Sequence, residues 1–315
     1  SDVTTRSESV PGRCGRFVLE RRIGGGGMGE IFLARDPAGG EVAIKRLLPE
    51  CAADPAFIGM FLDEARLVER LRHPNLCEVY EHGQAGRHYF LVMERIDGPS
   101  LAELLDRRGR RGLPFPLAAR VVAEVAAGLD YAHRATDERG EALGLVHRDV
   151  SPANIMIARD GRVKLVDFGL AKARTQLMKT QPGLVKGKFG YLAPEQLGGS
   201  VDARTDLFAL GLCLYEALTG EALFGQRTAA ETVRAIQRFA GPPPLAGRVP
   251  GVPPGLDAVL ARALAPDPAQ RFESARALRT TLGRAVVEAG HPAVSAAALA
   301  REITRGTSPP PAPAT

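Results

Sequence analysis

The residues best suited to chemistry lie in one short stretch near the middle of the chain. His147-Arg148-Asp149 is followed by Asn154, and Asp167 opens an Asp-Phe-Gly triplet further on. One carboxylate, one amide and a second carboxylate on a tight scaffold can hold a nucleophile and metal ions together, as phosphoryl transfer requires. The pattern predicts such a site if the chain also supplies a nucleotide-binding loop and a lysine upstream, and a substrate platform downstream.

The bulk composition is compatible with a folded globular enzyme, and it restricts the cellular compartments in which the protein is expected. The 315 residues are 45% hydrophobic and 24% charged, which suffices for two lobes or one large domain. There is no apolar run of 18 residues and no secretion signal, so we expect no membrane segment in this chain. The four cysteines are far apart, which argues against a zinc site or a disulfide framework. We expect a cytoplasmic protein, or the cytoplasmic domain of a longer, membrane-anchored one.

The charge balance argues against a nucleic-acid partner. Lys and Arg number 41 against 36 acids, a formal net charge of +5, and part of the excess lies in residues 107–111. Nucleic-acid binding needs a basic face with aromatic platforms, whereas aromatic residues make up only 5% of the chain. We interpret the basic run as a solvated loop.

A glycine-rich stretch near the start is the candidate phosphate-binding loop. Residues 17–23 read as a strand, residues 24–29 are Gly-Gly-Gly-Gly-Met-Gly, and residues 30–34 read as a second strand. The run satisfies G-x-G-x-x-G, but a dinucleotide-binding turn with that string opens a helix. A strand after the glycines favours a mobile flap whose backbone N–H groups cover phosphates. The expected nucleotide contacts here are Ile23, Gly24, Gly25, Gly26, Gly27, Met28 and Gly29.

A lysine follows at the spacing that such a flap requires. Strand alternation over residues 41–45 puts Val42 and Ile44 on one face, and Ala43 and Lys45 on the other. The small alanine leaves room for a flat ring, and the lysine supplies a point charge for phosphate.

The next helix supplies an anion for that lysine. The helix is expected over residues 55–71, with Asp54 as its N-cap. Glu64, at the edge of its apolar stripe, is the best-placed anion, because Asp63 and Glu69 lie on other faces. The stripe is formed by Phe57, Phe61, Ala65 and Val68.

Residues 94–98 break the strand pattern and predict a linker between two lobes. The backbone of Glu94 and Ile96 is placed to hydrogen-bond an adenine ring. Ser100 is expected to cap the helix that begins directly after it. A long buried helix is expected over residues 116–133.

Together these motifs resemble the eukaryotic-like (Hanks-type) protein kinases, specifically their bacterial Ser/Thr branch. The resemblance covers about residues 14–284, with many motifs in the family's order. It implies an α+β, bilobal protein kinase fold, with a small antiparallel-sheet N-lobe that has one main helix and a larger, mostly helical C-lobe. It also implies ATP and Mg²⁺ (or Mn²⁺) as cofactors and proteins as substrates.

The expected organisation follows from that match. It comprises a flexible lead-in (1–13), a protein kinase domain (14–284) with an N-lobe (14–93), a hinge (94–98) and a C-lobe (99–284), a C-terminal helical extension (285–306) and a proline-rich linker (307–315).

The resemblance implies a role for each motif residue. Asp149 matches the base that accepts or orients the substrate hydroxyl proton, and Asn154 and Asp167 match the two metal ligands. Lys45 matches the lysine on the α- and β-phosphates, with Glu64 as its ion-pair partner.

Further matches concern the adenine pocket and the active state. Met93 matches the residue at the back of that pocket. The apolar residues above and below adenine are matched by Ile31, Ala43 and Met156. The stack whose assembly marks the active state is matched by Val68, Val79, His147 and Phe168.

The downstream platform is also present. Residues 193–195, Ala-Pro-Glu, match the family motif, and Arg271 matches the buried arginine that pairs with Glu195. Asp206 matches the aspartate that holds the catalytic loop from below.

Two positions depart from the family. Most Ser/Thr kinases have Lys where this chain has Ser151, and Thr where it has Lys188. We expect a compensated swap, in which Lys188 returns a cation near Asp149 and the transferring phosphate while Ser151 supplies a hydroxyl. The alternative is that Lys188 points to solvent.

The segment between Asp167 and Glu195 carries Thr175 and Thr180. Arg148 can bind a phosphate there and order the segment, so we expect autophosphorylation at Thr175 and Thr180, with Thr180 as the preferred site. A transient dimer is one arrangement in which this autophosphorylation could occur. The alternative is a permanently disordered loop.

The sequence thus predicts an active Ser/Thr protein kinase. One rival is a pseudokinase or ATP-binding scaffold, for which Ser151 is the only support. The other rival, a dual-specificity or tyrosine kinase, rests on the same two departures.

Overall fold

The computed structural model describes residues 12–26, 28–168, 189–225 and 228–305. They form two compact units. The described part of the first is 12–26, 28–70 and 78–95, and that of the second is 71–77, 96–168, 189–225 and 228–305. The division at 95/96 falls inside the stretch where the sequence predicts a linker.

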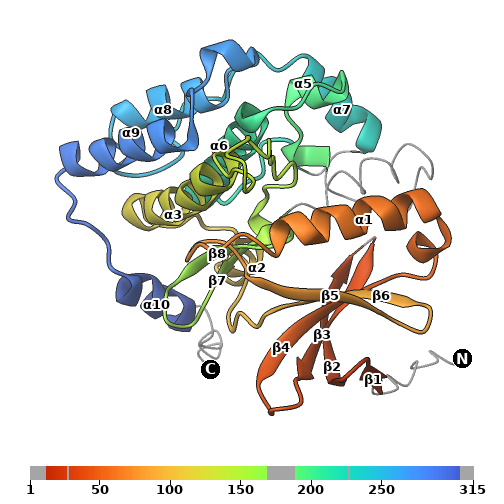
Figure 1. The fold of residues 1–315 in the computed structure, drawn as a ribbon. Helices are drawn as coiled ribbons and strands as arrows, with labels where there is room; N and C mark the ends of the chain where they lie inside the picture. The colour runs from red at the N-terminus through yellow and green to blue at the C-terminus, as the bar shows by residue number, and fades with distance from the viewer. Residues whose placement is uncertain (1–11, 27, 169–188, 226–227, 306–315) are drawn as a thin grey trace, which may run out of the picture. The chain divides into compact units, whose positions relative to one another are not determined.

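The first unit is built on a six-stranded antiparallel sheet (Figure 1). Its strand order is β1-β2-β3-β4-β6-β5, so β6 pairs with β4 and β5 forms an edge. The strands are β1 (Arg13–Cys14), β2 (Phe17–Gly26), β3 (Gly29–Arg35), β4 (Glu41–Leu47), β5 (Val79–Ala85) and β6 (His88–Glu94).

The register of this sheet separates its side chains into two sets. Lys45 lies opposite Ile31, and Ala43 lies opposite both Leu33 and Met93, so these five side chains share one face. The other face carries the small hydrophobic core. That core contains Cys14, Phe17, Leu19, Phe32, Ala34, Val42, Ile44, Phe90 and Val92.

The main helix of this unit, α1 (Pro55–Val68), begins as the sequence predicts. The carboxylate of Asp54 accepts a hydrogen bond from the N–H of Ala56 at 2.9 Å, and Pro55 takes the first helical position. The predicted stripe is buried. The helix ends at Val68 rather than near Leu71, because residues 71–77 pack with the second unit and Leu71 is buried there.

The second unit is mostly helical. Its longer helices are α2 (Leu101–Arg107), α3 (Phe115–His133), α6 (Ala203–Thr219), α7 (Ala229–Gln237), α8 (Gly255–Ala263), α9 (Ala275–Glu288) and α10 (Ala296–Arg305). Shorter elements are the helix α5 (Pro194–Leu197), the 3-10 turns η2 (Pro152–Asn154), η3 (Phe189–Tyr191) and η4 (Pro268–Gln270), and the hairpin of β7 (Ile155–Ile157) with β8 (Val163–Leu165).

The core of this unit lies between α3, α6 and their neighbours. The helix α3 packs against α6, α9 and β8, and α6 is buried along most of its length. Ser100 forms the predicted N-cap of α2 as a full capping box with Glu103. Gly220, in the left-handed conformation at φ 78°, ends α6.

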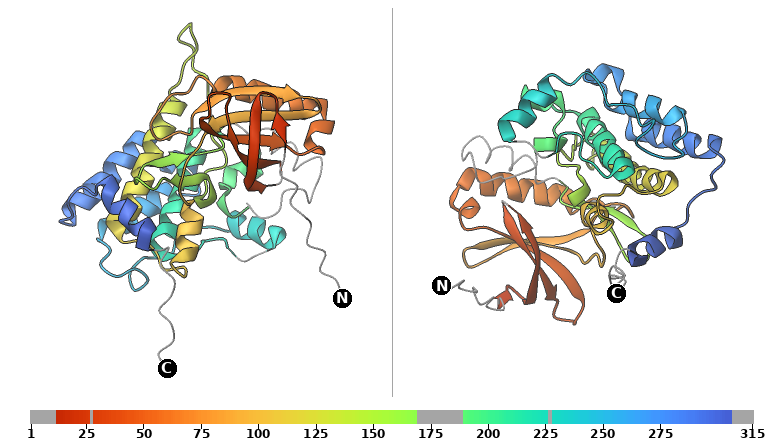
Figure 2. Two further views of the ribbon diagram at one scale, coloured as in Figure 1. Left: turned by 90° about the horizontal axis from the view of Figure 1, so that it is seen from below. Right: turned by 180° about the vertical axis from the view of Figure 1, so that it is seen from behind.

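The helix α10 lies against the β7–β8 hairpin (Figures 1 and 2). A side-chain Cβ at Gly161, in the turn of that hairpin, would come within 1.9 Å of the carbonyl oxygen of Ala296. Glu302 forms an ion pair with Arg108, and Leu299 and Ile303 are buried. The extension therefore packs as part of the second unit.

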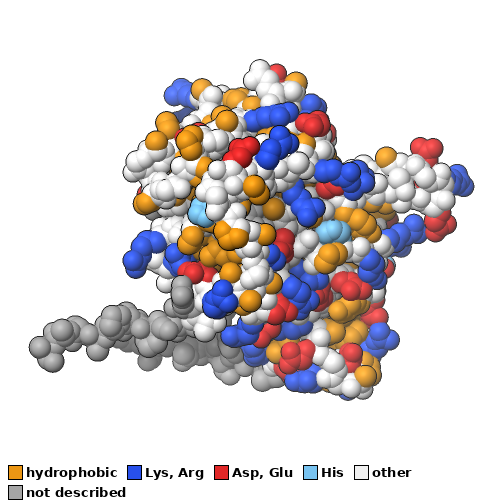
Figure 3. Space-filling model, turned by 90° about the vertical axis from the view of Figure 1, so that its left-hand side faces the viewer, with side chains coloured by type: hydrophobic (Ala, Val, Ile, Leu, Met, Phe, Trp, Pro, Cys, Tyr) orange, Lys and Arg blue, Asp and Glu red, His pale blue; other side chains and the backbone are white. Residues whose placement is uncertain are grey.

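Two observations concern the surface. On the face shown in Figure 3, basic and acidic side chains of the described residues are interspersed. In the described part of the chain, no helix combines the length and apolar character that crossing a bilayer would require.

Candidate active site

The glycine-rich stretch forms the tip of the β2–β3 hairpin. Gly24 pairs with Ile31, Gly25 with Glu30 and Gly26 with Gly29, so the ladder runs through the glycines. A Cβ at Gly29 would lie 2.6 Å from the carbonyl oxygen of Arg46, so this position needs glycine for a close backbone approach. The expected strand–glycine–strand arrangement is present, and Gly27 lies outside the described residues.

Lys45 is held on the sheet face that carries the other expected nucleotide contacts of this unit. It lies next to Ile31 across β3–β4. Lys45 and Met93 are each only 7% exposed, and Ala43 is 6% exposed. Burying an ammonium is costly unless an anion or a polar group serves it. The strand therefore presents a lysine whose position suits a phosphate contact.

The acids of α1 differ in what they bind. Asp63 pairs with Arg66 at 2.9 Å on the exposed surface. Glu69 contacts Nδ1 of His82 at 2.5 Å. Glu64, which lies between these two acids in the sequence, is half-buried. With both rivals engaged elsewhere, Glu64 remains the acid of this helix suited to Lys45.

The linker after Glu94 is fixed on each side by backbone hydrogen bonds. The N–H of Glu94 donates to the carbonyl of Glu78 at 2.8 Å, which holds it to the first unit. Beyond the linker, the N–H groups of Ile157 and Arg159 donate to the carbonyls of Pro99 and Asp97 at 2.9 and 2.8 Å.

Gly98 allows this second attachment. A Cβ there would lie 2.0 Å from the carbonyl oxygen of Ile157, so only glycine fits. The linker is thereby laid along β7, whose Met156 is the expected apolar contact for adenine. Ile96 is buried, at 8% exposure.

Asp206 holds the stretch that contains Asp149. Its two carboxylate oxygens accept hydrogen bonds from the backbone N–H groups of His147 and Arg148, both at 2.8 Å. Nε2 of His133 donates to the same carboxylate at 2.8 Å. Asp206 is 1% exposed, so these donors satisfy a buried anion. This is the supporting role that the resemblance implies, with His133 as an additional member.

His147 is fully buried and uncharged, and its ring forms two hydrogen bonds to the backbone. Its Nε2 donates to the carbonyl of Val166 at 3.0 Å, and its Nδ1 accepts from the N–H of Asp149 at 3.2 Å. A ring that donates with one nitrogen and accepts with the other is uncharged. Burial lowers the pKa of His147, against the opposing influence of Asp206 and the other nearby aspartates.

Asn154 fixes the carboxylate of Asp149. The amide nitrogen donates to the main-chain oxygen and to Oδ2 of Asp149, both at 2.8 Å. Asp149 is 8% exposed and Asn154 is 4% exposed. The hydroxyl oxygen of Ser151, which lies between them in sequence, is buried and has no hydrogen-bond partner within the described residues.

The β7–β8 hairpin brings the two expected metal ligands to the same end. Ile155 pairs with Leu165, and the N–H of Val166 donates to the carbonyl of Asn154 at 2.9 Å. Asp167 follows directly. An amide oxygen and a carboxylate are the hard oxygen donors that Mg²⁺ takes, so the donor set fits such an ion. No cluster of three His, Cys, Asp or Glu side chains suited to a metal occurs in the described part of the chain.

Two residues of this site have left-handed backbone conformations. Arg148 has φ 64° and Asp167 has φ 60°. This region is disfavoured for residues other than glycine, and such residues often mark functional sites. Next to Asp167, the ring of Phe168 packs edge-on against His147, with centroids 4.9 Å apart. Val68 and Val79, the other members of the expected stack, are buried in the first unit.

The downstream platform is joined by a buried ion pair. Both terminal nitrogens of Arg271 lie 2.7 Å from the carboxylate oxygens of Glu195. Thr205, at the start of α6, also donates to Glu195 at 2.9 Å. Arg271 is 3% exposed. The contact expected from the sequence is therefore formed.

Sequence reasoning missed a second link between this platform and α6. The hydroxyl of Tyr191 donates to Glu216 at 2.5 Å, and Arg110 pairs with the other oxygen of Glu216 at 2.9 Å. Burial raises the pKa of Glu216, against the lowering effect of Tyr191 and Arg110. The spacing of these three residues in the sequence does not predict that their side chains are in contact.

Lys188, Thr175 and Thr180, like Gly27, lie outside the described residues. The compensated swap and the phosphorylation sites therefore stay predictions.

Known protein kinases are similar in sequence to this chain. A family model for the protein kinase domain matches residues 17–282. The chain is 42% identical over 275 residues to the tyrosine-protein kinase MasK of Myxococcus xanthus, covering 85% of this chain and 42% of that protein. It is 40% identical over 270 residues to the serine/threonine-protein kinase PknL of Mycobacterium tuberculosis, covering 85% of this chain and 65% of PknL.

Solved structures give the same result. The crystal structure of the PknI kinase domain of Mycobacterium tuberculosis matches with a TM-score of 0.67 at 32% identity. The match covers 89% of this chain and 99% of that one. The expected bilobal kinase fold, with a small antiparallel-sheet lobe and a larger helical lobe, is confirmed.

The matched region makes up only part of these relatives. The chain spans 42% of MasK and 65% of PknL, so these relatives continue well beyond the matched region. Within that region the family model and the relatives cover most of this chain. The chain therefore belongs to the protein kinase family.

Proposed function

We propose that the chain is an active protein kinase that transfers the γ-phosphoryl group of ATP to Ser and Thr hydroxyls of proteins. The observation that carries the proposal is the double hydrogen bond from Asn154 to Asp149, on a loop anchored by Asp206. It leaves a carboxylate oriented by a donor on a fixed backbone, which is what a catalytic base needs.

Most of the proposed nucleotide contacts come from the first unit. Lys45 would contact the α- and β-phosphates, with Glu64 as its orienting anion, and the backbone of residues 24–29 would cover the phosphates. Ile23, Ile31, Ala43 and Met93 would supply apolar contacts to the nucleotide. The backbone of Glu94 and Ile96 and the side chain of Met156 would complete the adenine contacts.

The residues of the second unit would carry out transfer. Asp149 would orient the acceptor hydroxyl and take its proton as the oxygen attacks the γ-phosphorus. Asn154 and Asp167 would hold Mg²⁺ or Mn²⁺, which supplies charge neutralisation for the phosphates. The side chain of Arg148 is half-buried and forms no ion pair with an acid of the described residues, so its guanidinium suits a phosphate on Thr180 or Thr175.

Lys188 would replace the lysine that is absent at Ser151. The buried, unpaired hydroxyl of Ser151 supports the idea that this part of the site is completed by another group. Lys188→Ala should then lower turnover, because a cation near the developing phosphoryl charge is removed. Full turnover in that variant would reject the swap.

The main test is transfer of labelled phosphate from ATP to a generic protein substrate, with Mg²⁺ or Mn²⁺. Asp149→Asn should remove transfer. Glu64→Gln should lower kcat, whereas the neighbouring Asp63→Asn should not, because Asp63 only pairs with Arg66 on the surface. Wild-type protein without transfer in either metal would favour the pseudokinase.

The acceptor type needs a separate measurement. The similarity to MasK, named a tyrosine-protein kinase, favours tyrosine as the second candidate acceptor. Phosphoamino-acid analysis of the products should find phosphoserine or phosphothreonine. Phosphotyrosine alone would replace the Ser/Thr assignment. Mapping of ATP-treated protein tests Thr180 and Thr175 in the same experiment.

The proposed location is the cytoplasm, where ATP and reduced thiols are both available. All four cysteines are buried and none forms a disulfide.

A further inference from the structure

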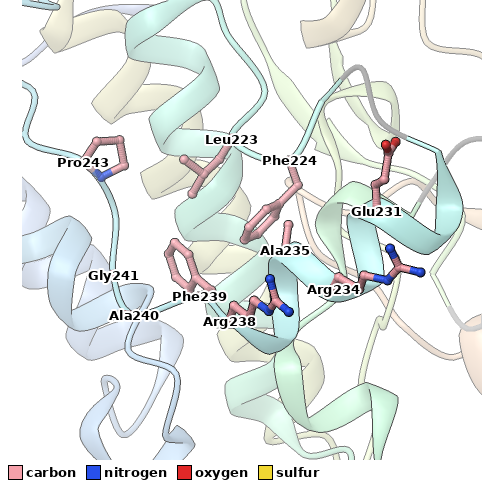
Figure 4. A pocket seen from close by; sticks show the side chains of 10 residues that line it. All are labelled: Leu223, Phe224, Glu231, Arg234, Ala235, Arg238, Phe239, Ala240, Gly241 and Pro243. Carbon is pink, nitrogen blue, oxygen red and sulfur yellow. The ribbon is translucent and has the colours of Figure 1, made fainter.

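A groove lies on the second unit, away from the Asp149 loop in sequence and lined by other elements. Its volume is about 540 Å³, and it is bounded by the chain after α6, by α7 and by the chain that follows α7 (Figure 4). We call it the aromatic–arginine groove. Its lining residues are Leu223, Phe224, Glu231, Arg234, Ala235, Arg238, Phe239, Ala240, Gly241 and Pro243.

The floor of the groove is apolar and firmly packed. The rings of Phe224 and Phe239 meet edge-on, with centroids 5.2 Å apart, and Phe239 also packs edge-on against Phe208 of α6 at 5.9 Å. Leu223 and Pro243 are half-buried beside them. Such a floor suits one aromatic or large aliphatic side chain from a partner.

The rim of the groove is positively charged. Arg234 and Arg238 are exposed and lie one helical turn apart, and neither side chain forms an ion pair with an acid in the described part of the chain. The carboxylate of Glu231 is already engaged, because Oε2 accepts from the N–H and the hydroxyl of Thr228 at 2.9 and 2.8 Å. The two guanidinium groups thus remain available to a ligand.

The helix alone does not explain this arrangement. Cations near a helix C-terminus are favourable, which accounts for part of the preference for arginine at these positions. Two like charges at a spacing of four residues, however, repel each other by a few tenths of a kcal/mol. The combination of paired arginines with an aromatic floor matches what acidic, hydrophobic peptides bind.

The groove adjoins the downstream platform around Ala-Pro-Glu, which the sequence predicts as the substrate platform. The helix α7 packs against η3 and α5, which carry the residues around Ala-Pro-Glu. A Cβ at Gly190 would touch the carbonyl oxygen of Phe224 at 3.5 Å. A protein chain bound at η3 can therefore reach the groove within a few residues.

We propose that the aromatic–arginine groove docks a segment of the protein substrate in which an aromatic or large aliphatic side chain is flanked by Asp or Glu. This inference rests on the proposed kinase function. The apolar side chain would enter between Leu223, Phe239 and Pro243, and the flanking carboxylates would pair with Arg234 and Arg238. The groove would then select substrates by a motif separate from the phosphorylated residue.

The first test measures binding of three fluorescent ten-residue peptides to the whole chain by anisotropy. One has a central Phe flanked by Asp and Glu, one has Ser in place of Phe, and one has Lys in place of the acids. The acidic Phe peptide should bind at least tenfold more tightly than the other two, and more weakly at high salt. Equal binding of the three peptides, or none, would overturn the proposal.

Charge-reversed variants assign the binding to the groove. Arg234→Glu/Arg238→Glu should weaken the acidic Phe peptide at least tenfold. The matched control, Arg284→Glu/Arg301→Glu, changes the same total charge at two exposed arginines of α9 and α10 and should bind within twofold of wild type. Equal effects of the two double variants would show a non-specific charge effect and reject the groove.

Kinetics connect the groove to phosphoryl transfer. A Ser/Thr acceptor peptide joined to the acidic Phe segment should have a KM about tenfold higher with Arg234→Glu/Arg238→Glu, at unchanged kcat, and the same acceptor without the segment should not distinguish the proteins. An unchanged KM for the joined peptide contradicts the docking role. Absent transfer with intact peptide binding contradicts the kinase function instead, and supports the groove as a binding surface.

Discussion

The side-chain amide of Asn154 donates to both the main-chain oxygen and the carboxylate of Asp149, at 2.8 Å each. Both partners are acceptors, so the nitrogen of the amide must face Asp149 and its oxygen must face the other way. One side chain can thus orient the base with one end and offer an oxygen to a cation with the other.

Replacement of Asn154 should separate these two contributions. Asn154→Ala removes the donor and the metal oxygen, and should lower kcat by about 10²- to 10³-fold, the usual effect of losing one oriented donor in an active site. Asn154→Asp restores an oxygen but places a second carboxylate against Asp149. It should be less stable than the Ala variant, because two buried like charges repel. Initial rates and thermal unfolding measure both effects; an Asp variant with wild-type stability would contradict the contact.

The pair Arg271–Glu195 should contribute strongly to stability. Arg271→Gln leaves Glu195 with an uncompensated charge in a largely buried site, which costs about 3–5 kcal/mol of the free energy of unfolding. The control is Arg159→Gln, because Arg159 and Asp97 are both more than half exposed and such pairs contribute at most about 1 kcal/mol. Urea denaturation compares them. Adding Glu195→Gln to Arg271→Gln should recover part of the loss, and similar costs for the two single variants would argue against a structural ion pair.

Stability should fall as the pH drops below about 6.5, the ordinary pKa of histidine, because of His147. Its pKa in the folded protein is lowered by burial, so below pH 6.5 the unfolded chain takes up a proton that the folded protein refuses. The folded state therefore loses about 1.4 kcal/mol per pH unit from this residue, until the pH reaches the lowered pKa. Denaturation between pH 7.5 and 5 measures the slope. His147→Gln should reduce this slope by about 1.4 kcal/mol per pH unit, which corresponds to one proton. An identical slope in the wild type and the variant would mean that another group titrates.

The contact between α10 and the β7–β8 turn should be visible in a glycine pair. Gly161 and Gly199 both have φ 84°, but a Cβ meets Ala296 only at Gly161 and nothing within 4 Å at Gly199. Gly199→Ala should cost about 1–2 kcal/mol for its backbone conformation alone. Gly161→Ala should cost about 1–3 kcal/mol more from the steric conflict.

Hydrogen exchange gives the second readout for that pair. The amides of α10 should exchange faster in Gly161→Ala and at the wild-type rate in Gly199→Ala. Equal stability and equal exchange in the two variants would mean that α10 does not depend on this contact.

Much of this architecture follows from local sequence signals. Asp54 and Ser100 form the caps that their side chains predict, and the alternation around Lys45 separates core from site in the observed register. The pairing of Arg271 with Glu195 was reached through the family resemblance, since no local signal joins residues so far apart in the sequence.

The remainder depends on partners that only the folded chain selects. His133 reaches Asp206, and Arg110 reaches Glu216, from positions that read as ordinary surface charges. The early end of α1 reflects packing of residues 71–77 with the other unit rather than a stop signal. The aromatic–arginine groove likewise combines segments that are unremarkable when each is read alone.

The left-handed conformations of Arg148 and Asp167 lower the stability of the fold, but they keep two side chains that the proposed site uses. Glycine at either position would relieve a backbone penalty of about 1–2 kcal/mol. It would also delete the guanidinium proposed to bind phosphate or the carboxylate proposed to bind the metal. Selection for a more stable chain alone would therefore favour glycine at both positions, so keeping these two side chains requires selection for activity.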